Sequence, residues 1–145
     1  MTTAAPPSGA IDLACRCGAV RLRVAGEPVA QLYCHCGDCR AAHAAAYVAA
    51  AIYPAAAVTA QGGALAATVV RATPRMRCAA CGTHLFSELA APGMRSVNAF
   101  LLPAGAFRPQ IHVQCQHAVL PVRDELPHFK GFPPGFGGTD ERVAW

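Results

Sequence analysis

Short apolar runs separated by turn-forming residues recur along most of the chain. In residues 20–24 polar and apolar residues alternate as Val-Arg-Leu-Arg-Val, which is typical of a strand with one buried face. Comparable runs, each bounded by Gly, Pro or Asn, cover residues 29–33, 46–53, 65–71, 84–88, 94–102 and 111–113. This regular spacing predicts a mainly β fold, arranged as a sandwich or an open barrel.

Only one segment favours a helix. Residues 37–46 are rich in alanine, and Asp38 near their start complements the helix dipole, so one or two helical turns are expected there. The tail after Pro127 is too rich in Gly and Pro for regular structure, and we expect its phenylalanines, Phe129, Phe132 and Phe136, to anchor it to the surface. With 145 residues and no internal repeat, the chain fits a single domain.

Composition narrows the choice of partners. Much of the 54% hydrophobic content is alanine, which buries little surface. Metal ions that cross-link parts of the chain would therefore add stability that the core alone does not supply. The net charge of +4 comes from scattered arginines, which argues against nucleic-acid binding. Residues 44–70 carry no charge, but Pro54 and Gln61-Gly62-Gly63 interrupt them, which favours two buried strands around a turn over a membrane span. The N-terminus lacks a basic start and an apolar core, so a cytoplasmic protein without a membrane partner is predicted.

The eight cysteines are grouped at spacings that indicate metal binding. A reducing cytoplasm disfavours a disulfide framework. Cys78-Ala-Ala-Cys81-Gly82 has the form of a zinc knuckle, in which two intervening residues let both sulfurs approach one ion and the glycine permits the turn. Cys15-Arg-Cys17-Gly18 supplies a second pair of thiolates before a glycine, and Cys34-His-Cys36-Gly-Asp-Cys39 supplies three thiolates within six residues.

Seven of these cysteines divide naturally into four and three. A structural zinc takes four ligands, whereas a catalytic zinc keeps one position open. The two glycine-trailed pairs, Cys15 with Cys17 and Cys78 with Cys81, are therefore expected to close a structural site. The remaining three, Cys34, Cys36 and Cys39, are expected to hold a reactive zinc with a vacancy.

Cys115 leaves an alternative open. It either closes the three-cysteine group into a second structural site, with little Lewis acidity left for catalysis, or is a buried thiol that behaves as a small apolar residue.

The histidines are weaker candidates for metal binding. His35 lies between two cysteines, so in an extended segment its side chain points away from theirs, which favours a hydrogen-bonding role behind the metal. The others fit no metal spacing and are expected to be ordinary polar residues: His43, His84, His112, His117 and His128. If the substrate is an anion, the arginines nearest the cysteines in sequence, Arg16, Arg40 and Arg77, are candidates to bind it.

The order of the cysteine motifs resembles that of the glutathione-dependent formaldehyde-activating enzyme family, which is related to centromere protein V-like zinc domains. The resemblance lies in Cys15-x-Cys17-Gly18, Cys34-His35-Cys36-x-x-Cys39-Arg40 and Cys78-x-x-Cys81-Gly82-Thr83. Ile111-His112-Val113 and Asp124-Glu125-Leu126-Pro127-His128-Phe129 look like the C-terminal signature of the family. The similar region covers residues 10–133, with a disordered N-terminal tail over 1–9 and a C-terminal tail over 134–145.

The resemblance implies a single-domain, tent-like fold of mixed β-sheet or sandwich type with a structural zinc on Cys15, Cys17, Cys78 and Cys81. It also implies a catalytic zinc on Cys34, Cys36 and Cys39. The implied chemistry joins formaldehyde to the thiol of glutathione as S-hydroxymethylglutathione, a carbon–sulfur lyase reaction in reverse, so the expected partner is a small-molecule thiol such as glutathione. Because the family's fold also occurs in non-enzymatic relatives, the alternative is a binding module in which both zinc sites are structural.

Overall fold

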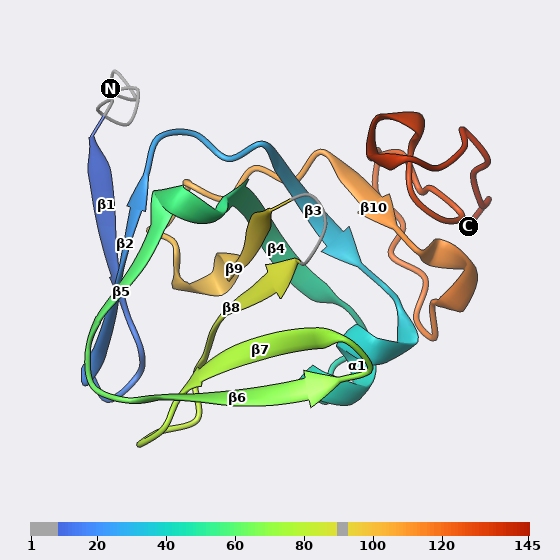
Figure 1. The fold of residues 1–145 in the computed structure, drawn as a ribbon. Coiled ribbons are helices and arrows are strands. Elements are labelled where there is room, and N and C mark those ends of the chain that lie inside the picture. Colours follow the sequence, from blue (N-terminus) through green and yellow to red (C-terminus); the bar gives the residue numbers. More distant parts are fainter. Residues whose placement is uncertain (1–8, 90–92) are drawn as a thin grey trace.

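Two sheets make up most of the computed structural model, which describes residues 9–89 and 93–145 (Figure 1). The smaller sheet is antiparallel in the order β1-β2-β5, from β1 (Ala10–Ala14), β2 (Val20–Ala25) and β5 (Val58–Gly62). The larger sheet has the order β10-β3-β4-β9-β8-β7-β6. Its strands are β3 (Ala30–Cys34), β4 (Val48–Pro54), β6 (Leu65–Val70), β7 (Thr73–Cys78), β8 (His84–Leu89), β9 (Met94–Asn98) and β10 (Ile111–Val113). All neighbours in it are antiparallel except β10 and β3, which are parallel.

Helical structure is confined to short segments. The α-helix α1 (Gly37–His43) follows β3, and the 3₁₀ helices are η1 (Ala55–Ala57), η2 (Ala99–Leu101), η3 (Cys115–His117) and η4 (Pro134–Phe136). Within the described parts of the chain, no helix is long and apolar enough to cross a membrane.

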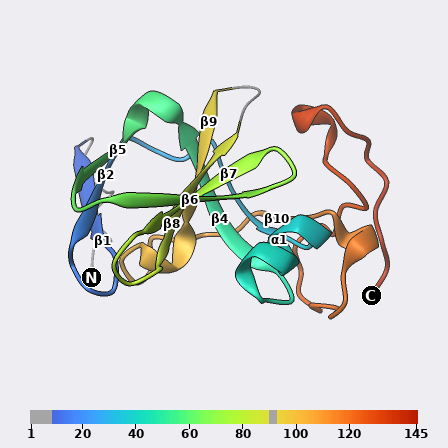
Figure 2. The same cartoon turned by 60° about the horizontal axis from the view of Figure 1, so that its bottom comes forward.

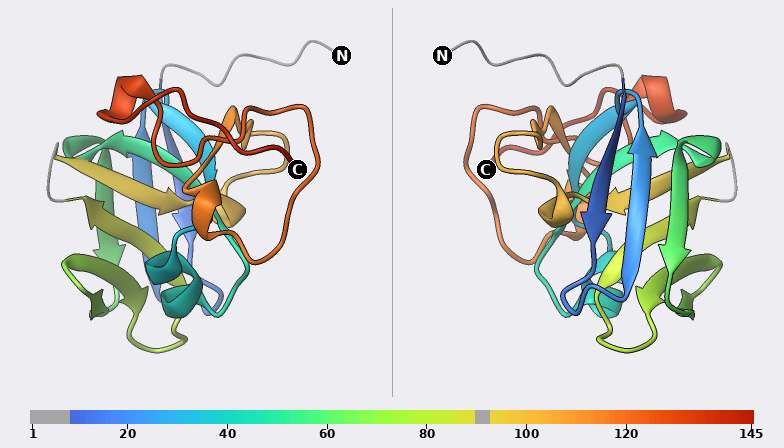
Figure 3. Two further views of the ribbon diagram at one scale, coloured as in Figure 1. Left: turned by 90° about the vertical axis from the view of Figure 1, so that its right-hand side faces the viewer. Right: turned by 90° about the vertical axis from the view of Figure 1, so that its left-hand side faces the viewer.

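The core lies between the two sheets (Figure 3). Strand β2 shows the predicted alternation, since Val20, Leu22 and Val24 are fully buried while its arginines are exposed. Across from them, the larger sheet contributes Leu85 and Val97, which are also fully buried. The prediction of a mainly β fold is therefore confirmed, and the sheets do not close into a barrel.

Several elements differ from the sequence prediction. Strands β1, β5 and β7 were not predicted; β5 is mostly exposed, and β7 loses its alternation at a bulge between Met76 and Arg77. The prediction of two buried strands over residues 44–70 is wrong, since β4, β5 and β6 lie there and β5 and β6 are mostly exposed. The helix expected over 37–46 ends earlier, since Ala44 takes a left-handed conformation with φ of 48°.

The two ends of the chain also bear on the predictions. The tail expected to be disordered over 1–9 lies, apart from Gly9, outside the described residues. At the other end, the anchoring prediction is right for Phe129, which is buried, and wrong for Phe132 and Phe136, which are 42% and 44% exposed. The C-terminal segment lies beside β10, on the opposite side of the molecule from β1 and β2 (Figure 2).

Candidate metal centres

Four cysteines converge where the turn after β1 meets the end of β7. The sulfurs of Cys15, Cys17, Cys78 and Cys81 all lie within 4.8 Å of one another. The Sγ atoms of Cys15 and Cys17 are 3.6 Å apart, and those of Cys17 and Cys78 are 3.8 Å apart. Four thiolates at 2.3 Å from one tetrahedral zinc are separated by about 3.8 Å, so the donor set fits this ion. The glycine after Cys81, Gly82, has φ of 76° and makes the turn possible.

Local hydrogen bonds favour the thiolate form of Cys15 and Cys81, whereas for Cys17 the bond from the Ala19 backbone is outweighed by those with Cys15 and Cys81, which raise its pKa to about 11. The Val20 N–H lies 3.3 Å from the Cys15 sulfur, and this bond lowers the pKa of Cys15. The hydroxyl of Thr83 lies 3.1 Å from the Cys81 sulfur, and hydrogen bonding to Thr83 lowers the pKa of Cys81 to about 5. Because a metal binds the thiolate form, these contacts prepare the site for an ion.

The other three predicted ligands converge at the start of α1. Cys34 ends β3, Cys36 is the N-cap residue of α1, and Cys39 lies in its first turn. Their sulfurs lie within 4.8 Å of one another, with 3.6 Å between Cys34 and Cys39. The Cys36 sulfur accepts a hydrogen bond from the Cys39 N–H at 3.2 Å. Three sulfurs at this spacing fit three corners of a zinc tetrahedron.

Hydrogen bonds within the group concentrate negative charge on one sulfur. Bonds from Cys34 and then Cys39 are the main causes that hold the pKa of Cys36 well below its ordinary value. Cys115 does not belong to this three-sulfur group. Burial raises the pKa of Cys115 to about 11, so it is a protonated thiol, as in the interpretation of it as a small apolar residue.

The three-cysteine group opens on a cavity of about 400 Å³ over one face of the larger sheet. Small side chains of three adjacent strands line this face, among them Ala50 of β4, Ser87 of β8 and Ser96 of β9. The alanines that contribute little to the core therefore leave room for a small molecule beside the sulfurs. Phe132 of the C-terminal segment also lines the cavity, which accounts for its exposure.

Arg75 of β7 lines this cavity and contacts α1. Its side chain is only 5% exposed, its Nη1 donates to His43 Nε2 at 3.2 Å, and its Nη2 lies 3.9 Å from the Cys39 sulfur. Because arginine can only donate, His43 carries its proton on Nδ1. Burial, with the nearby charges of Arg75 and Arg77, lowers the pKa of His43 to about 4, so this ring is neutral.

A second neutral histidine lies in the same cavity. His84 Nε2 lies 2.9 Å from the Ser87 hydroxyl, and the rings of His84 and His43 meet edge to face with their centroids 4.5 Å apart. Burial is the main cause that lowers the pKa of His84 to about 3. The cavity is thus lined by one buried cation, three sulfurs, two neutral imidazoles and the Asp38 carboxylate, which is paired with Arg71.

The β6–β7 hairpin holds α1 in place, and Figure 1 shows the helix beside its tip. Arg71 pairs with Asp38 at 2.8 Å, and Arg77 donates to the Ala42 carbonyl at 2.7 Å. Arg40 donates to the carbonyl of His35 at 3.4 Å. Two of the three arginines nominated from the sequence, Arg40 and Arg77, thus bond the backbone, whereas no feature of the sequence singled out Arg75.

A buried histidine pair lies behind the three cysteines. His35 Nε2 and His112 Nδ1 are 2.9 Å apart, and His112 Nε2 lies 2.7 Å from Asp124 Oδ2. Since the carboxylate accepts, His112 donates through Nε2, so its Nδ1 accepts from His35. Both rings are fully buried. The hydrogen-bonding role predicted for His35 agrees with this geometry, but the expectation that His112 is an ordinary polar residue missed its position.

The parallel pairing of β10 with β3 creates this contact. It sets His112 opposite Tyr33 and Val113 opposite Cys34, so the histidine lies beside the three-cysteine segment. Asp124 also lies 3.1 Å from His128 Nε2, and that nitrogen is 2.8 Å from the Val122 carbonyl. Two sequence signals pointed to these residues: a histidine inside an otherwise apolar run, and the resemblance of both segments to the C-terminal signature of the family.

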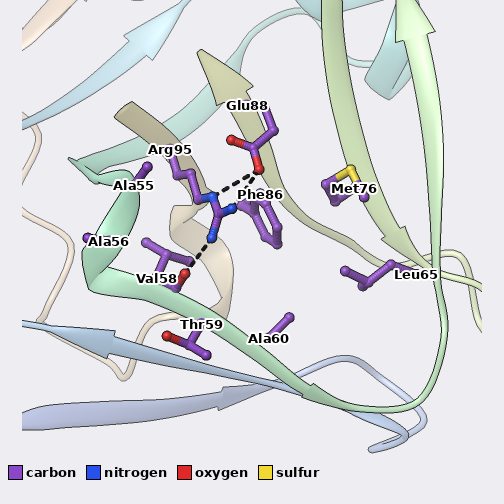
Figure 4. A pocket seen from close by; sticks show the side chains of 10 residues that line it. All are labelled: Ala55, Ala56, Val58, Thr59, Ala60, Leu65, Met76, Phe86, Glu88 and Arg95. Carbon is purple, nitrogen blue, oxygen red and sulfur yellow. Dashed lines mark hydrogen bonds and ion pairs between the residues drawn. The ribbon is translucent and has the colours of Figure 1, made fainter. Parts of the chain in front are cut away.

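A larger hollow of about 560 Å³ lies elsewhere, between β5 and strands β8 and β9 (Figure 4). It is lined mostly by apolar residues, and its charged groups satisfy each other: Arg95 pairs with Glu88 at 2.9 Å and lies over the Phe86 ring. Because neither cysteine nor histidine lines it, the smaller cavity at the three cysteines is the stronger candidate for chemistry.

Comparison with known proteins places the chain in a family. The model of the glutathione-dependent formaldehyde-activating enzyme family matches residues 10–117, which include all eight cysteines. Among curated proteins none matches. A crystal structure of a Rhodobacter sphaeroides protein is similar in fold, with 23% identity and a TM-score of 0.54 over 65% of this chain and 89% of that one. The chain belongs to the glutathione-dependent formaldehyde-activating enzyme family.

Proposed function

We propose that this protein is a zinc-dependent carbon–sulfur lyase that acts on adducts of a thiol and a small aldehyde, such as S-hydroxymethylglutathione formed from glutathione and formaldehyde. The observation that carries the proposal is the convergence of Cys34, Cys36 and Cys39 at the wall of a cavity, without Cys115 in their group. Family membership supports the substrates. The eight cysteines, all free, agree with a cytoplasmic location.

In this proposal the two cysteine groups have different tasks. Cys15, Cys17, Cys78 and Cys81 hold a structural zinc that ties the turn after β1 to the end of β7. The three-cysteine group holds a second zinc, which when bound acts as a Lewis acid and keeps a substrate thiol deprotonated at neutral pH.

The side chains around the cavity have roles in the reaction. In adduct formation a bond forms between sulfur and the carbonyl carbon, the carbonyl π pair moves to oxygen, and the thiol proton ends on that oxygen. Ala50 and Ser96 leave space for the aldehyde, while His84 and Ser87 offer neutral hydrogen-bonding groups to its oxygen. The cavity holds both reactants in one place, which favours their addition.

Metal content and exchange kinetics test the proposal together. The zinc-loaded protein is expected to contain two zinc ions per chain and to accelerate the interconversion of glutathione, formaldehyde and adduct, followed by NMR exchange spectroscopy. Because thiols and formaldehyde react unaided, the rate without protein is subtracted. Cys36→Ser should lose one zinc and the acceleration, whereas Cys115→Ser should keep both. A Cys36→Ser protein that catalyses as well as wild type would exclude this site as the reactive centre.

The alternative of a binding module predicts a different rate of adduct interconversion. If both zinc sites are structural, a protein with two tightly held zinc ions gives no acceleration above the unaided rate. The same measurement therefore separates the two functions.

A further inference from the structure

Arg75 is a buried cation without a carboxylate partner among the described residues. Arginine stays protonated in proteins, and this side chain is 5% exposed. Asp38 on the neighbouring helix also lines the cavity, but its carboxylate is paired with Arg71 at 2.8 Å. A charge removed from water without compensation is unfavourable, so the opposite charge must come from another group that faces the same cavity.

The sulfurs of the three-cysteine group supply that charge. Arg75 Nη2 lies 3.9 Å from the Cys39 sulfur, at the wall of the cavity that the three cysteines share. Its Nη1 is held by the neutral His43 at 3.2 Å, which fixes the guanidinium toward the sulfurs. Its Nε is buried and makes no hydrogen bond with the described residues, so this side of the guanidinium is not paired with another protein group.

The charge of a loaded site shows what this cation does. Three thiolates around a divalent zinc carry one net negative charge, which a neutral fourth ligand leaves unchanged and a thiolate ligand doubles. In a cavity less polar than water, the second negative charge is disfavoured unless a cation lies close by. Arg75 is the cation that lies within the cavity.

We propose that Arg75 makes the three-cysteine site select an anionic sulfur ligand, a substrate thiolate, over neutral ligands of similar size. The proposal rests on the proposed function, since it concerns the ligand that joins Cys34, Cys36 and Cys39, and it assigns the preference for thiols to one residue. Arg75 acts through the charge on the bound sulfur. It is thus a specificity-determining residue, and its effect is measurable without any aldehyde or turnover.

Ligand binding to the cobalt-substituted full-length protein tests this assignment. The probes are 2-mercaptoethanol, which binds as a thiolate, and imidazole, which binds as a neutral ligand, and each is titrated while the cobalt absorption bands are recorded. Arg75→Gln should weaken 2-mercaptoethanol by roughly 10- to 100-fold and imidazole by less than about threefold. Arg75→Lys, which keeps the charge, should restore most of the thiol affinity. The matched control is Arg23→Gln, an exposed arginine of β2 that does not line the cavity, which should change neither affinity.

Each result decides the point. Equal weakening of both ligands in Arg75→Gln, or equal loss of thiol binding in the Gln and Lys variants, would show that Arg75 only holds α1 and would overturn the inference. Unchanged thiol binding in Arg75→Gln would overturn it as well, with the proposed function left standing. A wild-type site that takes up cobalt but no thiol would instead contradict the proposed function itself. Should Arg75→Gln not fold, Arg75→Met, which keeps the apolar stem, provides the same comparison.

Discussion

Replacing His112 by leucine is expected to destabilise the protein by about 3 kcal/mol, because the ring is fully buried and bonded at both nitrogens. Leucine fills a similar volume, so the loss comes from hydrogen bonds. The His35 N–H loses its acceptor, and a buried unpaired group of this kind costs roughly 1–3 kcal/mol. The bond to the Asp124 carboxylate contributes about 1.5 kcal/mol, the lower value for a charged partner, because that side chain is 32% exposed and water can replace the donor.

Chemical denaturation of the zinc-loaded protein measures this loss. The matched control is His117→Leu, a histidine on the surface, which should change the free energy of unfolding by less than about 0.5 kcal/mol. The double variant His35→Leu/His112→Leu gives the sharper test. The double variant removes both hydrogen-bonding rings, so neither is left with an unpaired buried nitrogen facing the other position. Its destabilisation should therefore be smaller than the sum of the two single values by about 1–2 kcal/mol. Strict additivity, or a His112→Leu protein as stable as wild type, would refute the reasoning.

Three further predictions concern the metal sites, pH and the backbone. Cys81→Ser should abolish soluble folding, because a structural zinc contributes on the order of 10 kcal/mol, whereas Cys39→Ser should remain folded with one zinc fewer; circular dichroism and metal analysis distinguish the two. The pKa of His84 is lowered to about 3, so below about pH 6.5 the unfolded chain takes up a proton that the folded chain does not, and stability falls. Between pH 7.5 and 5.5 wild type should lose about 1 kcal/mol more than His84→Gln, and equal losses in denaturant titrations would contradict this. Gly62→Ala should lower the melting temperature, because φ is 94° and the new Cβ would lie 2.5 Å from a carbonyl oxygen, whereas Gly9→Ala, with open space, should not.

Spacing along the chain was enough to predict which cysteines converge. Sulfurs two or three residues apart come together through local turns, so Cys34, Cys36 and Cys39 needed no knowledge of the fold. The joining of the pairs at Cys15 and Cys78 followed from counting ligands, and the geometry agrees with it. Alternation likewise identified β2, whose buried and exposed faces are distinct.

The supporting residues could not be predicted in this way. Arg75 is one of many scattered arginines, and only the packing of β7 against α1 makes it a buried cation. His112 and Asp124 meet His35 because a three-residue strand pairs in parallel with β3, a contact that leaves no local pattern in the sequence. Strand β7 was missed for a related reason, since its bulge breaks the alternation that would have revealed it.

The parallel pairing of β10 with β3 also bears on the order in which the protein is made. The three cysteines leave the ribosome within six residues of one another and can meet a metal early in synthesis. Their supports arrive far later, since His112 is 77 residues beyond His35 and Asp124 follows it by 12. A nascent chain can therefore bring the three sulfurs together long before the residues that fix their geometry have been made. The last quarter of the chain is what turns a cysteine-rich segment into an ordered site.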